Sequence, residues 1–233
     1  VCTSLNWGYG RKAWATLENA VVEDVRTGNT GGVISKYVAI AETWGLEGRK
    51  AEALAAAKEA VAGGRDETAL LPAARIFLAA GKGAEARGFS VELEKQVRKA
   101  ARAYGKVIEG EIALEERRPT DALDAFQAAR KFSDVWLARF DLGVAYVEAG
   151  LYAQALSEFE ICQTRRGEAT AIFLDDLPTF RYLAPLPYWL GRAKEGLGMK
   201  PAAAEHYRAF LALRPEGLRD PLAADARKRL AAS

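Results

Sequence analysis

The chain has 233 residues, 50% of them hydrophobic, and 33 basic against 31 acidic residues give a formal net charge of +2. A charge so close to neutral produces no strong field to attract nucleic acid or an acidic membrane surface. The two cysteines, Cys2 and Cys162, are too few for a disulfide framework in a chain of this length. We expect both to be free thiols and Cys162 to be a buried one.

No apolar run approaches the roughly 18 residues that a membrane-spanning helix requires, and no signal peptide opens the chain. Because the first residue is Val1 rather than Met, we expect the chain to be a piece of a longer protein. The free thiols favour a cytoplasmic location. The alternative is a periplasmic location as part of a longer anchored or secreted protein.

Helix-forming residues dominate the chain, and β-branched residues never alternate over a strand length, so the local preference is helical nearly throughout. In chain order we expect a half-repeat, five helical hairpins and a capping helix, at residues 8–26, 34–67, 67–100, 103–136, 136–169, 184–217 and 221–231. Glycines such as Gly81 and Gly150 are predicted to end helices. Asp220 is predicted to cap the last helix, and Thr120 or Asp121 the second helix of 103–136.

The clearest unit is 136–169, in which small and large residues follow a fixed order. Counting Trp136 as position 1, Gly143 stands at 8 and Phe159 at 24, and Gly143 lies 33 residues after Gly110. Small residues let two antiparallel helices approach, and large residues fill the space beside that contact. The pattern resembles the tetratricopeptide repeat and covers 34–217. It implies an all-α, right-handed superhelical solenoid of antiparallel helix hairpins; the alternative is an irregular all-α bundle.

The period is interrupted once, because Gly191 lies 48 residues after Gly143. The excess falls at about residues 167–183, a stretch too apolar for a solvated loop. One interpretation is that the second helix of 136–169 runs long and packs against the next hairpin. The other is an inserted segment that folds over a binding groove or forms a dimer contact.

The resemblance implies that the first helices of the hairpins line a concave groove, through positions 2, 5, 9 and 12 of each unit. We expect partner contacts from seven such residues: Arg75, Tyr104, Glu111, Phe140, Val144, Tyr188 and Arg192. Together they predict an apolar groove with cationic ends at Arg75 and Arg192. The alternative for Phe140 is packing between hairpins. The Lys and Asn residues with which chaperone-binding members grip a terminal carboxylate are absent.

Residues that could support catalysis do not gather in this sequence. His206 is the single histidine, and Asp175 and Asp176 are adjacent, so on a helix they would point in different directions. We therefore expect no enzyme activity, no cofactor and no metal site.

The expected function is a non-catalytic scaffold that binds a protein or peptide, with no nucleic-acid partner and no membrane insertion. Because 173–197 resembles repeat regions of bacterial Ser/Thr kinases, the alternative is a regulatory or oligomerisation region of a larger bacterial signalling protein. Self-association through the apolar 172–182 stretch is a third hypothesis.

Overall fold

The structure is a computed structural model that describes residues 10–171, 183–214 and 220–232, and all regular structure in these ranges is helical. The helices are α2 (Gly10–Thr27), α3 (Thr30–Leu46), α4 (Lys50–Gly63), α5 (Glu67–Ala79), α6 (Gly83–Glu94), α7 (Lys99–Glu115), α8 (Pro119–Phe132), α9 (Trp136–Glu148), α10 (Tyr152–Thr164), α11 (Arg166–Ala171), α13 (Leu186–Gly196), α14 (Lys200–Ala212) and α15 (Pro221–Ala232).

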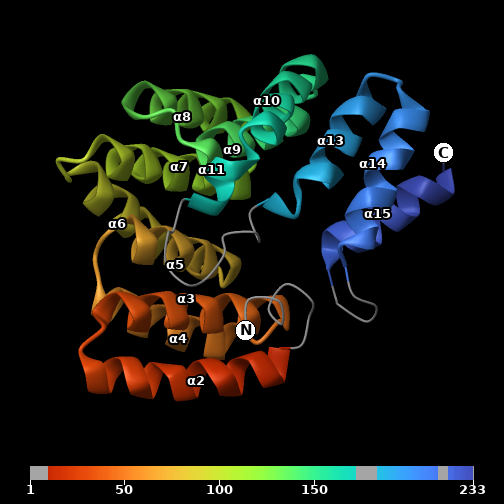
Figure 1. The fold of residues 1–233 in the computed structure, drawn as a ribbon. Helices are drawn as coiled ribbons and strands as arrows, with labels where there is room; N and C mark the ends of the chain where they lie inside the picture. The colour runs from red at the N-terminus through yellow and green to blue at the C-terminus, as the bar shows by residue number, and fades with distance from the viewer. Residues whose placement is uncertain (1–9, 172–182, 215–219, 233) are drawn as a thin grey trace.

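The helices form two layers of a continuous array. From α2 to α10, and again from α13 to α15, each helix packs against the next, and α10 packs against α13. The first helices of the hairpins, α3, α5, α7, α9 and α13, also pack against one another in that order and form the inner layer. Figure 1 shows the array passing from α2–α4 through α5–α10 to α13–α15. The predicted all-α solenoid of helical hairpins is confirmed.

The turn inside each hairpin has the same backbone geometry. The residue at position 15 has a positive φ in all five hairpins, with values of 76°, 77°, 57°, 74° and 75° at Gly48, Gly81, Arg117, Gly150 and Gly198. The next N–H then donates to a carbonyl five residues back, as Leu151 does to Tyr146 over 2.8 Å. This turn satisfies the last carbonyls of the first helix and reverses the chain. Glycine adopts a positive φ without strain, so Arg117 is the unfavourable member of the series.

In the last three hairpins, the two helices cross where a glycine meets an aromatic ring. A Cβ atom built on Gly110, Gly143 or Gly191 would lie 2.5, 2.5 or 2.6 Å from a ring carbon of Phe126, Phe159 or Tyr207. Such distances are far inside the ordinary carbon–carbon contact of about 3.5–4.0 Å. Only glycine therefore lets the ring pack on the backbone of the facing helix, which is the role predicted for positions 8 and 24.

The two predicted helix caps have different outcomes. Asp220 caps α15, since its Oδ1 accepts the backbone N–H of Leu222 at 2.9 Å. The capping role predicted for Thr120 or Asp121 is wrong, because α8 already begins at Pro119 and Arg118 occupies the cap position without a side-chain cap bond. Asp121 lies in the first turn instead, where its carboxylate pairs with Arg118 and favours the positive end of the helix.

A buried contact closes the 136–169 hairpin. The indole N–H of Trp136 donates to the carbonyl of Cys162 at 2.9 Å, and both side chains are buried. The predicted buried free thiol of Cys162 is confirmed, and burial raises the pKa of this thiol. Cys2 lies outside the described residues.

The interruption before the last hairpin is described in part. The second helix of 136–169 does not run on unbroken, because α10 ends at Thr164 and the short helix α11 begins at Arg166. Residues 172–182, which include Asp175 and Asp176, lie outside the described residues. The hypotheses placed on them therefore stay predictions. None of the helices in the described ranges has the length and apolarity to cross a membrane.

Candidate binding groove

A groove of about 960 Å³ opens on the inner layer, between α5, α7, α9 and α13. Half-buried apolar side chains from each of these helices contribute to it, among them Leu78, Leu114, Val144 and Trp189. The full set of lining residues is Arg75, Leu78, Ala79, Glu111, Leu114, Glu115, Arg117, Pro119, Phe140, Asp141, Val144, Glu148 and Trp189. Four consecutive inner helices thus present one surface with apolar and charged parts.

Four of the seven predicted residues line the groove: Arg75, Glu111, Phe140 and Val144. Tyr104 and Tyr188 do not, because they are buried with only 5% and 2% of their surface exposed. Tyr188 packs against Tyr207 and Phe210 of α14 and against Ala223 and Ala226 of α15, and Tyr104 belongs to the main hydrophobic core. The groove takes its lining mostly from positions 9, 12 and 13 instead. Phe140, at position 5 of its unit, is buried with 7% of its surface exposed and still lines the groove.

The predicted cationic ends of the groove are wrong. Arg75 is engaged inside the protein, with its Nε 2.8 Å from Glu111 Oε1 and its Nη2 3.1 Å from Asp141 Oδ2. Arg192 does not line the groove. Its Nη1 donates to the hydroxyl of Tyr188 at 3.0 Å, and that hydroxyl donates to Asp225 on α15 at 2.7 Å. Tyr188 and Arg192 therefore hold the last helix onto α13.

Asp141 is the important residue that the sequence did not reveal. It is buried on α9, where it shares the Arg75 guanidinium with Glu111 of α7. Burial raises the pKa of the Asp141 carboxyl well above its ordinary value; Arg75 opposes the rise and the Glu111 carboxyl adds to it. Two carboxyl groups and one guanidinium from three successive inner helices thus form one polar cluster beside the apolar lining.

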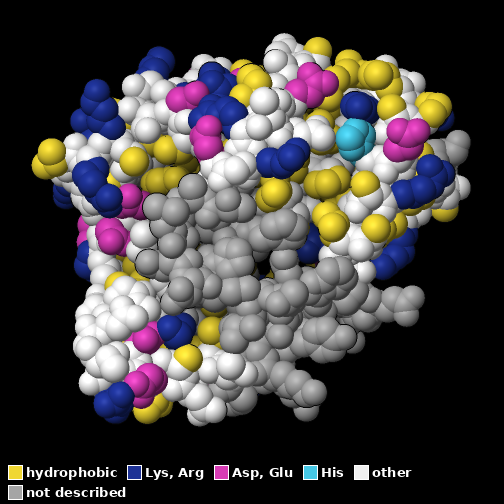
Figure 2. Space-filling model, in the orientation of Figure 1, with side chains coloured by type: hydrophobic (Ala, Val, Ile, Leu, Met, Phe, Trp, Pro, Cys, Tyr) yellow, Lys and Arg dark blue, Asp and Glu magenta, His cyan; other side chains and the backbone are white. Residues whose placement is uncertain are grey.

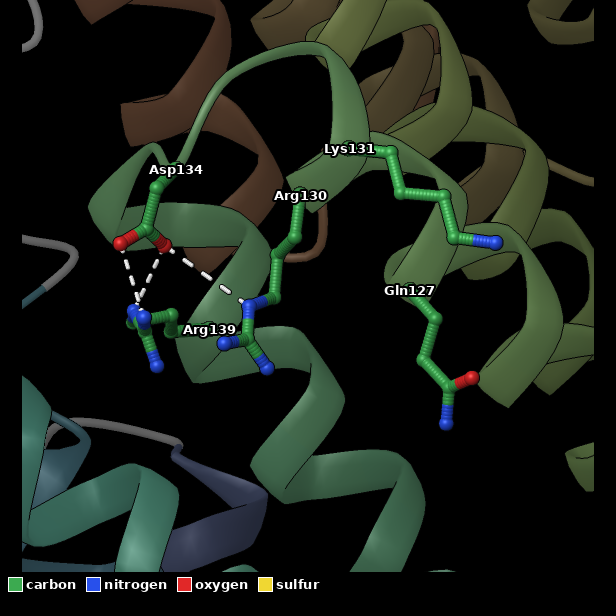
Figure 3. Close-up of a pocket in the computed structure, with 5 residues that line it drawn as sticks. All are labelled: Gln127, Arg130, Lys131, Asp134 and Arg139. Atoms are coloured by element: carbon green, nitrogen blue, oxygen red, sulfur yellow. Dashed lines mark hydrogen bonds and ion pairs between the residues drawn. The ribbon is translucent and has the colours of Figure 1, made fainter.

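A second hollow, of about 370 Å³, lies where α8 meets α9 and is lined by residues of these two helices and of the turn between them (Figure 3). Its lining includes three cations, Arg130, Lys131 and Arg139. Figure 3 shows Lys131 pointing away from the group that Asp134 forms with the two arginines. Arg139 Nε lies 2.6 Å from Asp134 Oδ1, and both arginines also pair with Glu158 over 2.8 Å. The protein's own acids, Asp134 and Glu158, therefore engage both guanidiniums.

The rest of the described surface carries charges of both signs (Figure 2). Figure 2 shows acidic and basic side chains interspersed on one face of the molecule. Within residues 10–171, 183–214 and 220–232, no group of three or more His, Cys, Asp or Glu residues is arranged to hold a metal ion. The imidazole of His206 is half-buried on α14, and its pKa is lowered by burial and by the nearby Lys194.

Comparisons with known proteins agree with this architecture. No family model and no curated protein matches the sequence. Among solved structures, 99% of the chain matches 41% of a chain in the APC/C hetero-tetramer Cut9–Hcn1, with 15% identity and a TM-score of 0.61. In a second match, 96% of the chain aligns with 99% of PilF from Pseudomonas aeruginosa, with 13% identity and a TM-score of 0.52. The chain has the tetratricopeptide-repeat fold.

One further structure belongs to the same comparison. YrrB, described as a tetratricopeptide-repeat protein with an unusual peptide-binding site, matches 90% of the chain over 98% of its own length, with 18% identity and a TM-score of 0.45. In the present tetratricopeptide-repeat array, the inner helices α5, α7, α9 and α13 supply the groove.

Proposed function

We propose that this tetratricopeptide-repeat array is a non-catalytic scaffold that binds an extended segment of another protein in the groove of α5, α7, α9 and α13. The observation that supports this most strongly is the groove itself. Its volume of about 960 Å³ lies within the range of roughly 300–1,000 Å³ that is usual for small-ligand sites. An open groove spanning four helices suits an elongated ligand.

The apolar part of the groove is the source of binding free energy in this proposal. Leu78, Leu114, Val144 and Trp189 are half-buried in the chain alone, so a ligand can bury what remains exposed. An indole ring is one of the side chains that most often dominate an interface. The polar cluster of Arg75, Glu111 and Asp141 then orients the ligand rather than attracting it.

Panning a random-peptide display library against the full chain tests the proposal. Val144→Arg places a long charged side chain in the groove, and Ala79→Trp fills it from the exposed last residue of α5. Val91→Arg is the matched control, because Val91 is 46% exposed on α6 and does not line the groove. The proposal expects peptides that bind the chain and Val91→Arg but neither groove variant. Peptides that bind all four proteins alike would contradict it, and thermal unfolding by circular dichroism confirms that each variant is folded.

A further inference from the structure

The charges that line the groove are unequal. Three carboxylates, on Glu111, Glu115 and Glu148, and the buried Asp141 carboxyl face two guanidiniums, on Arg75 and Arg117. Arg75 is engaged by Glu111 and Asp141, so an acidic ligand would have to displace carboxylates that are already in place. The cluster of Arg75, Glu111 and Asp141 therefore provides little attraction for an anionic ligand.

The rim of the groove carries two carboxylates that form no ion pair within the described ranges. Glu115 and Glu148 are exposed, and neither forms an ion pair with another residue of the described ranges. They are the last residues of α7 and α9. Arg117 is exposed nearby, in the turn that follows α7. Two open carboxylates against one guanidinium leave the rim acidic.

Helix direction strengthens this acidity. The groove lining includes the last residues of α5, α7 and α9, which are Ala79, Glu115 and Glu148. The carboxyl end of a helix carries a partial negative charge, which basic side chains usually offset. None of these three helices has a basic residue in its last turn, whereas α8 ends with Arg130 and Lys131. Three negative helix ends and two carboxylates thus coincide beside exposed apolar surface.

We infer that the occupant of the groove is a cationic peptide segment, in which a Lys or Arg lies next to an apolar or aromatic residue. The apolar residue packs on Leu114, Val144 and Trp189, and the cation lies at the rim between Glu115 and Glu148. This inference rests on the proposed function and names the chemistry of its partner. It reverses the groove chemistry expected from Arg75 and Arg192 alone.

The peptides selected by the groove test the inference through their composition. The relevant peptides are those that bind the unmodified chain but not Val144→Arg or Ala79→Trp. Because the rim is acidic, these peptides should be enriched in Lys or Arg beside an apolar residue. Enrichment in Asp or Glu, or no charge preference, would overturn the inference and leave the proposed function standing. If no selected peptide depends on the groove, both fail.

A direct affinity measurement follows with one selected peptide, labelled with a dye, and its Lys→Gln analogue. The double variant Glu115→Gln/Glu148→Gln should bind the Lys peptide about 4- to 25-fold more weakly, from roughly two- to fivefold for each exposed carboxylate, and should bind the analogue as the unmodified chain does. Glu160→Gln/Glu205→Gln is the control of equal charge change, because both residues are exposed and lie outside the groove. Equal weakening by the two double variants would overturn the rim as the binding site.

A second copy of the chain is the other occupant that the experiment must recognise. Sedimentation at several concentrations compares the unmodified chain with Val144→Arg. A monomer in both cases agrees with a peptide partner. A dimer that Val144→Arg dissociates would place a second copy in the groove and overturn the inference.

Discussion

Gly143→Ala tests whether close helix approach holds each hairpin together. The added Cβ would lie 2.5, 2.8 and 2.9 Å from three carbons of the Phe159 ring. Contact of carbon atoms is optimal at about 3.5–4.0 Å, so ring and helix must separate by about 1 Å. Phe159 has 0% exposure, so the ring has no free space to enter.

The expected loss follows from two opposing contributions. Overpacking a core costs about 1–3 kcal/mol, and a ring without free space belongs in the upper half of that range. Replacing a helical glycine with alanine returns about 1 kcal/mol. The free energy of unfolding should therefore fall by about 1–2 kcal/mol. Gly88→Ala is the control, because Gly88 is exposed within α6 and a Cβ there meets nothing within 4 Å. It should raise the free energy of unfolding by about 0.5–1 kcal/mol.

Urea unfolding followed by far-UV circular dichroism measures both variants. Adding Phe159→Leu to Gly143→Ala removes the ring from the clash, so the double variant should be more stable than the sum of the two single effects predicts. A Gly143→Ala protein as stable as Gly88→Ala, or additive effects in the double variant, would refute the packing argument.

Three further measurements test separate parts of the structure. Folding raises the pKa of Asp141, so the folded chain keeps a proton that the unfolded chain releases above its ordinary pKa of about 4. Stability should therefore fall as the pH rises from there toward the folded pKa, and the stability of Asp141→Asn relative to the unmodified chain should rise over that range; a difference independent of pH would contradict this. In a Cys2→Ser background, the buried Cys162 thiol should react with Ellman's reagent only as urea unfolds the chain, and rapid reaction without urea would show that the thiol is accessible. Arg117→Gly should raise the free energy of unfolding by about 1 kcal/mol, because Arg117 has a φ of 57° where the other hairpins have glycine, and an unchanged urea midpoint would argue against strain there.

Much of the fold follows from the sequence because it depends on local pairs at a fixed period. The helix turns at Gly81 and Gly150 and the contact of Gly143 with Phe159 each involve residues of one hairpin. The start of α8 is harder to predict, because Pro119 favours the first helical position while Thr120 and Asp121, just after it, favour the cap position.

The groove was harder to predict because it depends on contacts between hairpins. The period places Tyr104 and Tyr188 on the inner helices but does not reveal that other helices bury them, as α14 and α15 bury Tyr188. The ion pair of Arg75 with Asp141 joins residues 66 apart, and no spacing rule within a repeat indicates it. A signal was present in the isolated acid within the apolar stretch WLARFDLGVAYV, because a buried carboxylate requires a partner.

The affinity of a groove-selected Lys peptide for the chain and for Glu115→Gln/Glu148→Gln tests the central claim most directly. The double variant should bind this peptide about 4- to 25-fold more weakly and should bind its Lys→Gln analogue with unchanged affinity. Equal affinity of the Lys peptide for both proteins would contradict an acidic rim that recognises a cation.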